Sequence, residues 1–231
     1  MPATMNITRS QFGESLESLR RRLIEMGNAV DDMMATALRA LTEQSGEMAE
    51  RVLYADDEVD NLDIQIEAEC MRLLALQQPM ARDLRLIGTA MKVITDLERI
   101  GDHAVDIAKV ARKLSKEPLY APLVDIPKMG TRVREMLEDA LSAFVNHDLP
   151  LVDKVVVADD EVDTMFHQLR DELHAVMRRD PELVVQASYL LFVAHYLERI
   201  ADHTVNIAER VHYVETGNLT QLAKSHKSGD K

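Results

Sequence analysis

The chain has 231 residues, of which 27 are Lys or Arg and 40 are Asp or Glu, so its formal charge is −13. This acidic balance counts against nonspecific binding to nucleic acid and against docking to an anionic membrane by charge alone. Glycine, proline and aromatic residues are scarce, while 46% of residues are hydrophobic, which favours a helical protein over a sandwich or barrel. With a single cysteine, Cys70, neither an intramolecular disulfide nor a cysteine zinc cage can form.

Targeting and membrane-spanning signals are missing from the sequence. No stretch approaches the roughly 20 uncharged apolar residues that a bilayer-spanning helix needs. Residues 1–9 have no apolar core followed by a small-residue cleavage site. Together with the lone cysteine, this predicts a soluble cytoplasmic protein.

Apolar residues in the first half return at intervals of three and four in three long runs. The first run covers 10–44 and is broken by Ser45-Gly46, the second ends near Gln78-Pro79, and the third covers about 80–115. This period predicts three helices, and the short turns between them favour antiparallel packing.

Three prolines between residues 117 and 127 interrupt the helical pattern and predict a linker. The pattern then resumes. It predicts helices at about 127–147, at 148 or 150 to 179, and at 181–216, the last with an N-cap, a first-turn proline and an acidic first turn in Asp180-Pro181-Glu182. Residues 217–231 are polar and are predicted to be a disordered tail.

The two halves of the chain are copies of one unit. Residues 55–60 recur unchanged as 158–163, and Leu-Glu-Arg-Ile-Gly-Asp-His at 97–103 returns as Leu-Glu-Arg-Ile-Ala-Asp-His at 197–203. Each copy falls at the same place in its half, which indicates an internal duplication. The sequence therefore predicts an all-α fold of six helices in two tandem, pseudo-symmetric three-helix bundles. We place the bundles at 10–116 and 127–216.

Carboxylates recur every four residues on the third helix of each unit. The rows are Glu98, Asp102 and Asp106 in the first copy, and Glu198, Asp202 and Asn206 in the second. On a helical wheel at about 100° per residue these rows lie opposite the core stripe, so we expect them on the outside of the bundle. The second and fifth helices add two further pairs at the flanks of their core stripes: Asp56 with Asp60, and Asp159 with Asp163.

Such oxygen-rich surfaces suit hard or borderline cations, among them Fe(III), Mn(II), Mg(II) and Zn(II). Carboxylates at this spacing repel one another by a few tenths of a kcal/mol per pair, and Arg99 and Arg199 lie beside them in the sequence. An acidic stripe on a helix is, however, more often a solvated face than a metal site. Duplication does not decide between the two, because a copied helix also copies its solvated face.

The remaining candidate groups give no catalytic constellation. His103 and His203 follow the aspartates directly and point nearer the edge of the core, where a structural role is expected. The other histidines considered, which are His147, His167, His174, His195 and His212, show no ligand spacing and are interpreted as bystanders. There is no glycine-rich phosphate loop, nucleophile elbow or interior Glu-x-x-His pair. We therefore predict no catalytic residue, and interpret Cys70 as a core or boundary residue.

The duplicated Leu-Glu-Arg-Ile-x-Asp-His segments at 97–103 and 197–203, and the stretch 78–87 that leads into the third helix, resemble the phosphate-uptake regulator family, PhoU. The resemblance covers roughly residues 10 to 216. It implies two three-helix bundles that carry a Glu/Asp-x-x-x-Asp motif each, with iron or zinc clusters bound there in some members; magnesium or manganese would also suit the ligands. By this motif the ten residues named above would be the ligands, and Asn206 would weaken the second site because an amide oxygen carries no charge.

The resemblance also implies a function and partners. Family members are negative regulators of the phosphate response, thought to contact the ATPase of the phosphate ABC transporter and the sensor histidine kinase of the phosphate regulon, and they often form homodimers. A metal-binding adaptor is thus the leading hypothesis, with membrane contact only through its partners. Two alternatives stay open: a carboxylate-bridged metalloenzyme, and a helical scaffold whose acidic faces are merely solvated.

Overall fold

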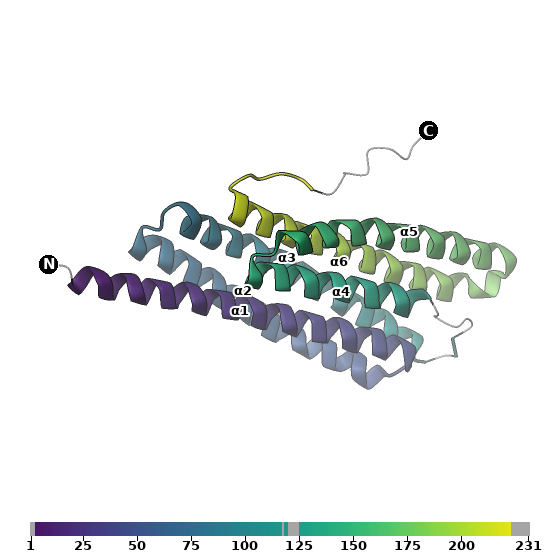
Figure 1. Ribbon diagram of the computed structural model, residues 1–231. Helices are drawn as coiled ribbons and strands as arrows, with labels where there is room; N and C mark the ends of the chain where they lie inside the picture. Colours follow the sequence, from purple (N-terminus) through teal and green to yellow (C-terminus); the bar gives the residue numbers. More distant parts are fainter. Residues whose placement is uncertain (1–2, 117, 120–124, 223–231) are drawn as a thin grey trace.

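The structure is a computed structural model that describes residues 3–116, 118–119 and 125–222, with side chains from residue 11 onward. Within these ranges the chain forms no strand, and the predicted all-α architecture of six helices is confirmed (Figure 1). The helices are α1 (Ala3–Thr42), α2 (Gly46–Gln77), α3 (Ala81–Leu114), α4 (Asp125–Asn146), α5 (Leu149–Arg179) and α6 (Val184–Thr216), and a 3₁₀ turn (Pro181–Leu183) precedes α6.

The ends of the helices follow local capping chemistry. Ser45 and Asp148 cap α2 and α5, and each side chain accepts a hydrogen bond of 3.2 Å from the amide three residues further on. The two caps lie 103 residues apart, so the duplication extends to the turns. Asp180 caps the 3₁₀ turn before α6 as the sequence predicts. The first helix begins at Ala3, earlier than the expected residue 10.

The segment after α6 differs from the expected disordered tail over the part that the structure describes. Gly217 ends α6 in the left-handed conformation (φ 77°), and the Leu222 amide donates a 2.6 Å hydrogen bond to Glu209 Oε1. The chain therefore turns back onto α6 up to residue 222. Residues 223–231, and residues 117 and 120–124 of the predicted linker, lie outside the described part of the chain.

A single hydrophobic core runs through both halves of the molecule. α3 packs against α6 about as extensively as against α1 and α2, while α1 also crosses α4 (Figure 1). Cys70 is fully buried in this core, and burial raises the pKa of its thiol to about 12, which is consistent with its predicted packing role. No helix in the described ranges is long and apolar enough to span a bilayer.

Two equivalent glycines allow α1 and α4 to approach closely. A Cβ added at Gly27 would lie 2.6 Å from Leu141 Cδ1, and one added at Gly130 would lie 2.5 Å from Leu38 Cδ1. Each glycine thus forms the hole for a leucine of the opposite helix. Both the glycines and the leucines are 103 residues apart, so the contact is made twice around a local pseudo-twofold axis.

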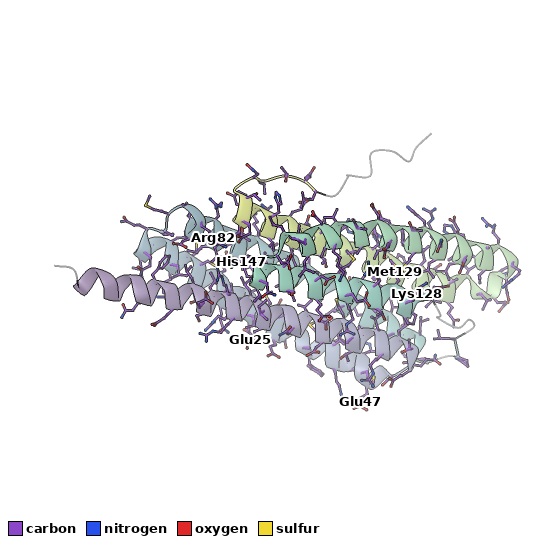
Figure 2. The ribbon with its side chains drawn as sticks, viewed as in Figure 1. Glu25, Glu47, Arg82, Lys128, Met129 and His147 are labelled. Atoms are coloured by element: carbon purple, nitrogen blue, oxygen red, sulfur yellow. The ribbon has the colours of Figure 1, made fainter. Side chains whose placement is uncertain are left out.

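Polar contacts also join the two halves at the end where α6 finishes. Glu215 of α6 accepts a 2.7 Å contact from Arg82 of α3 and a 2.8 Å contact from His147, which precedes α5. Figure 2 shows Arg82 and His147 near each other over this end of the molecule. Arg82 thus joins the two halves through Glu215, and His147 contacts the same carboxylate from within the second half, so it is not the bystander that its spacing indicated.

Candidate functional site

In the first half, the predicted acids of α2 and α3 lie close to one another. Burial raises the pKa of Asp56, and the charges of Asp60 and Asp102 raise it further. Burial likewise raises the pKa of Glu98, followed by the charges of Asp102 and, more weakly, Asp60. The four carboxylates are close enough to repel one another.

The α3 row is only partly exposed to solvent. The Glu98 side chain is 29% exposed and that of Asp102 is 43% exposed. Arg99 lies 3.4 Å from Glu98 and 3.0 Å from Asp102, so it offsets part of their repulsion. Glu98 and Asp102 are thus partly buried beside α2 and do not lie on a fully solvated face.

The corresponding acids of the second half are more buried than side chains on the outer face that the sequence predicts for them. The Glu198 side chain is 16% exposed and that of Asp202 is 24% exposed, while Asp159 on α5 is buried. Burial raises the pKa of Glu198, followed by the charge of Asp202 and, last, that of Asp163. Glu198 Oε2 is buried and accepts no hydrogen bond, so a charged oxygen is held there without full compensation.

His195 belongs to this second cluster, which corrects its interpretation as a bystander. Its Nδ1 lies 3.2 Å from Glu198 Oε2, within ion-pair range when the imidazole is protonated but not aligned for a hydrogen bond. The signal in the sequence was the spacing, since residues three apart share a helix face. The first half has Thr95 at the equivalent position, so only the second cluster combines nitrogen with oxygen donors.

Asp106 and Asn206 lie apart from these clusters, in the interface between α3 and α6. Asp106 accepts a 3.0 Å contact from Lys109 and contributes, after burial, to a raised pKa of Tyr196. Asn206 donates a 3.2 Å hydrogen bond to Asp96 on α3. The structure therefore brings Asp56, Asp60, Glu98 and Asp102 together in the first half and Asp163, Glu198 and Asp202 together in the second, and it places Asp106 and Asn206 elsewhere.

The α3–α6 interface contains a polar network that sequence reasoning missed. His203 Nδ1 donates to Asp96 Oδ1 at 3.0 Å, and the His103 ring stacks on Tyr196 with 5.7 Å between centroids. The two imidazoles are 5.9 Å apart. Burial and then the proximity of His203 lower the pKa of His103. Both histidines thus stand at the contact between the halves, as their expected structural role requires.

The donor atoms of the two clusters suit a cation, but the side chains are not arranged as a metal site. Carboxylates with pKa values raised by burial and by each other would be stabilised by a bound metal ion. As the side chains stand, no three His, Cys, Asp or Glu groups of the described chain gather into a metal-holding set. A metal would therefore have to draw the carboxylates together by side-chain rotation.

Comparisons with known proteins agree with this geometry. The PhoU domain family model matches the chain twice, at residues 23–111 and 126–211. The chain belongs to the PhoU domain family. A relative from Clostridium acetobutylicum, named phosphate-specific transport system accessory protein PhoU homolog, is 40% identical over 94% of this chain and 99% of its own length. A homolog of the same name from Aquifex aeolicus is 39% identical over 94% of the chain and 98% of its length.

Two solved PhoU structures share the fold. The crystal structure of PhoU from Pseudomonas aeruginosa superposes with a TM-score of 0.87 at 36% identity, covering 90% of this chain and all of that one. The phosphate transport system regulatory protein PhoU from Streptococcus pneumoniae superposes with a TM-score of 0.86 at 33% identity, covering 91% of this chain and all of that one. The arrangement of six helices is thus that of the PhoU family along nearly the whole chain.

Proposed function

We propose that this protein is a cytoplasmic regulatory accessory protein of the phosphate-specific transport system, and that it restrains phosphate uptake and the phosphate-starvation response. The observation that carries the proposal is the match to accessory proteins of that system over 94% of this chain and 99% of the Clostridium relative. In this role it is a non-catalytic adaptor between the ATPase of the phosphate ABC transporter and a sensor histidine kinase. Long exposed helices and an acidic surface suit such an adaptor.

The proposal includes metal binding at the two clusters. Asp56, Asp60, Glu98 and Asp102 would hold a cation between α2 and α3, and Asp159, Asp163, Glu198 and Asp202 would hold one between α5 and α6. Such a metal would neutralise carboxylates that otherwise repel one another. The support is the donor chemistry: oxygen-only donors in the first cluster suit iron, manganese or magnesium, and His195 beside Glu198 also suits zinc.

The metal proposal is tested by removing the charges on α3 and α6 together. We expect the variant Glu98→Ala/Asp102→Ala/Glu198→Ala/Asp202→Ala to lose bound metal, because each cluster then keeps only the acids of one helix. Elemental analysis of purified protein measures this, and circular dichroism checks that the fold is retained. The control Asp106→Asn should keep its metal, since Asp106 lies outside both clusters. Unchanged metal content in the quadruple variant would remove the ligand assignment.

The regulatory proposal is tested in phosphate-replete cells. We expect deletion of the gene to switch on a phosphate-starvation promoter despite ample phosphate. We also expect the tagged protein to recover the transporter ATPase or the sensor kinase, identified by mass spectrometry. A deletion strain that keeps the promoter silent, with neither partner recovered, would contradict an adaptor role.

A further inference from the structure

Large apolar side chains are exposed on the second half of α2 and at the start of α3. The turn between these two helices lies at the end of the molecule where α1 begins (Figure 1). Ile64 and Met71 of α2 are 64% and 54% exposed, Leu84 of α3 is 48% exposed, and Met80 in the turn is 79% exposed. Ile64 and Met71 are two helical turns apart on one face, about 10 Å along the axis. Because α2 and α3 run antiparallel, the end of α2 lies beside the start of α3, so these side chains form one elongated apolar surface.

The duplicated half shows that the fold does not need this apolar surface. Ile64 and Met71 correspond to His167 and His174 at the same 103-residue offset. The second bundle therefore builds the same hairpin with polar residues at these outward positions. Leu84 of α3 keeps an exposed apolar equivalent in Val184, so the difference between the copies lies on α2, where apolar residues that one copy has and the other lacks are evidence for a contact outside the bundle.

Two acidic side chains that are not among the predicted metal ligands lie on α2 beside these apolar residues. Asp63 and Glu67 are about two turns and one turn before Met71, and burial together with the charge of Glu67 raises the pKa of Asp63. Their equivalents in the second half are Phe166 and Arg170, so the negative charge is also specific to the first. The nearest arginine in the turn, Arg82, already pairs with Glu215.

We propose that the α2–α3 face formed by Asp63, Ile64, Glu67, Met71, Met80 and Leu84 docks an amphipathic helix of a protein partner, with an apolar stripe against Ile64, Met71 and Leu84 and Lys or Arg residues against Asp63 and Glu67. Two neighbouring helices offer a groove that a third helix can fill with anchors at one-turn and two-turn spacing. This inference rests on the proposed adaptor function and assigns its partner-binding surface.

The charge of this face favours a basic helix over a second copy of the chain or a membrane surface. A second copy of the chain would bring another −13 of formal charge and an identical acidic face, and like charges across an interface are unfavourable. An anionic membrane surface is disfavoured for the same reason. A basic amphipathic helix satisfies both the apolar and the acidic parts of the face.

The test measures binding of the full-length protein to two purified probes, the detergent-solubilised phosphate transporter and the cytoplasmic part of the sensor kinase. Ile64→His/Met71→His introduces the residues of the second bundle, so the fold should tolerate it. We expect it to weaken binding to one probe by roughly tenfold or more. Asp63→Asn/Glu67→Gln should weaken it less and flatten its salt dependence. The matched control, Val157→Ser/Val185→Ser, removes exposed apolar residues from the second bundle and should bind like wild type.

The outcomes separate the surface from the function. If wild type and the Ile64→His/Met71→His variant bind a probe equally, the docking surface is wrong and the adaptor function stands. If wild type binds neither probe, the adaptor function fails and the docking surface fails with it. If the variant instead breaks a homodimer seen by light scattering, the occupant is a second copy and the proposal is overturned.

Discussion

At the scale of single residues, the two copies of one motif occupy different electrostatic environments. Glu98 and Glu198 begin identical Glu-Arg-Ile segments, yet Glu198 is more buried and has an oxygen without a hydrogen bond. Uncompensated burial of a carboxylate raises its pKa and lowers stability when it is ionised. The difference comes from packing around α5 and α6, which a motif match does not reveal.

This difference predicts the effect of neutralising Glu198 in metal-free protein. A carboxyl whose pKa is raised on folding binds its proton more tightly in the folded state, so stability falls as pH rises from the unfolded value of about 4.5 through the folded value. Glu198→Gln should therefore raise the unfolding free energy at pH 7 by about 1 kcal/mol and flatten this fall. Urea unfolding between pH 4 and 8 with a chelator present measures both.

The matched control is Glu98→Gln, which should gain less because Glu98 is more exposed and contacts Arg99. A Glu198→Gln protein that is less stable than wild type at pH 7 in chelator would mean that the carboxylate is compensated in the folded state.

At the residue level the sequence pointed to candidate positions through a repeated pattern, and their role as metal ligands stays a prediction. The spacing of the carboxylates indicated Glu98, Asp102, Glu198 and Asp202. The structure places these residues beside the acids of α2 and α5. The spacing did not indicate that Asp106 lies near Tyr196 of α6, because one wheel assigns a helix a single core stripe whereas α3 also packs against α6; the ligand role of Asp106 stays a prediction. Contacts between the halves depend on tertiary packing, which periodicity within one helix does not contain.

At the scale of helices, the existence and approximate length of each helix were predictable, because the helical period of the apolar residues ends where helix-breaking residues occur. Ser45, Asp148 and Asp180 are N-caps in the structure, and all three have side chains with the oxygen acceptor that a cap needs. The crossing of α1 and α4 was not predictable. The glycines at its centre resemble any helical glycine until the opposite leucine is known.

Because α1 and α4 approach closely at Gly27 and Gly130, a side chain added at either glycine should lower the stability of the protein. Gly27→Ala should destabilise the protein by about 1–2 kcal/mol, because the new methyl group would overlap Leu141 and displace it from a buried position. Gly130→Ala should behave alike, since Leu38 occupies the equivalent hole. Thermal unfolding followed by circular dichroism measures the change.

Gly88→Ala is the control for helix propensity. A Cβ at Gly88 would contact nothing within 4 Å, so this substitution should stabilise α3 by about 0.5–1 kcal/mol. Adding Leu141→Ala to Gly27→Ala should cost less than the two single changes together. A Gly27→Ala protein as stable as the Gly88→Ala protein would show that Leu141 moves aside without cost.

At the scale of the whole molecule, duplication creates a problem wherever equivalent residues meet at the pseudo-twofold axis. Positions 31 and 134 are equivalent by the 103-residue offset, so identical residues there would place like charges in contact. The chain has Asp31 and Arg134 instead. Arg134 Nε and Nη2 donate to the two oxygens of Asp31 at 2.8 and 2.6 Å, a paired geometry that is among the stronger ion-pair arrangements.

Placing the same residue at positions 31 and 134 should therefore weaken the contact between the two halves and lower the free energy of unfolding. Arg134→Asp places two carboxylates together and should destabilise the protein by about 2 kcal/mol, more than Arg134→Ala, which only removes the pair. The exchange Asp31→Arg/Arg134→Asp keeps opposite charges and should recover most of the loss. Urea unfolding of the four proteins at low salt measures these differences, and 0.5 M NaCl should reduce the penalty of Arg134→Asp. If the exchanged protein is no more stable than Arg134→Asp, then local packing and not opposite charge holds α1 against α4 at this point.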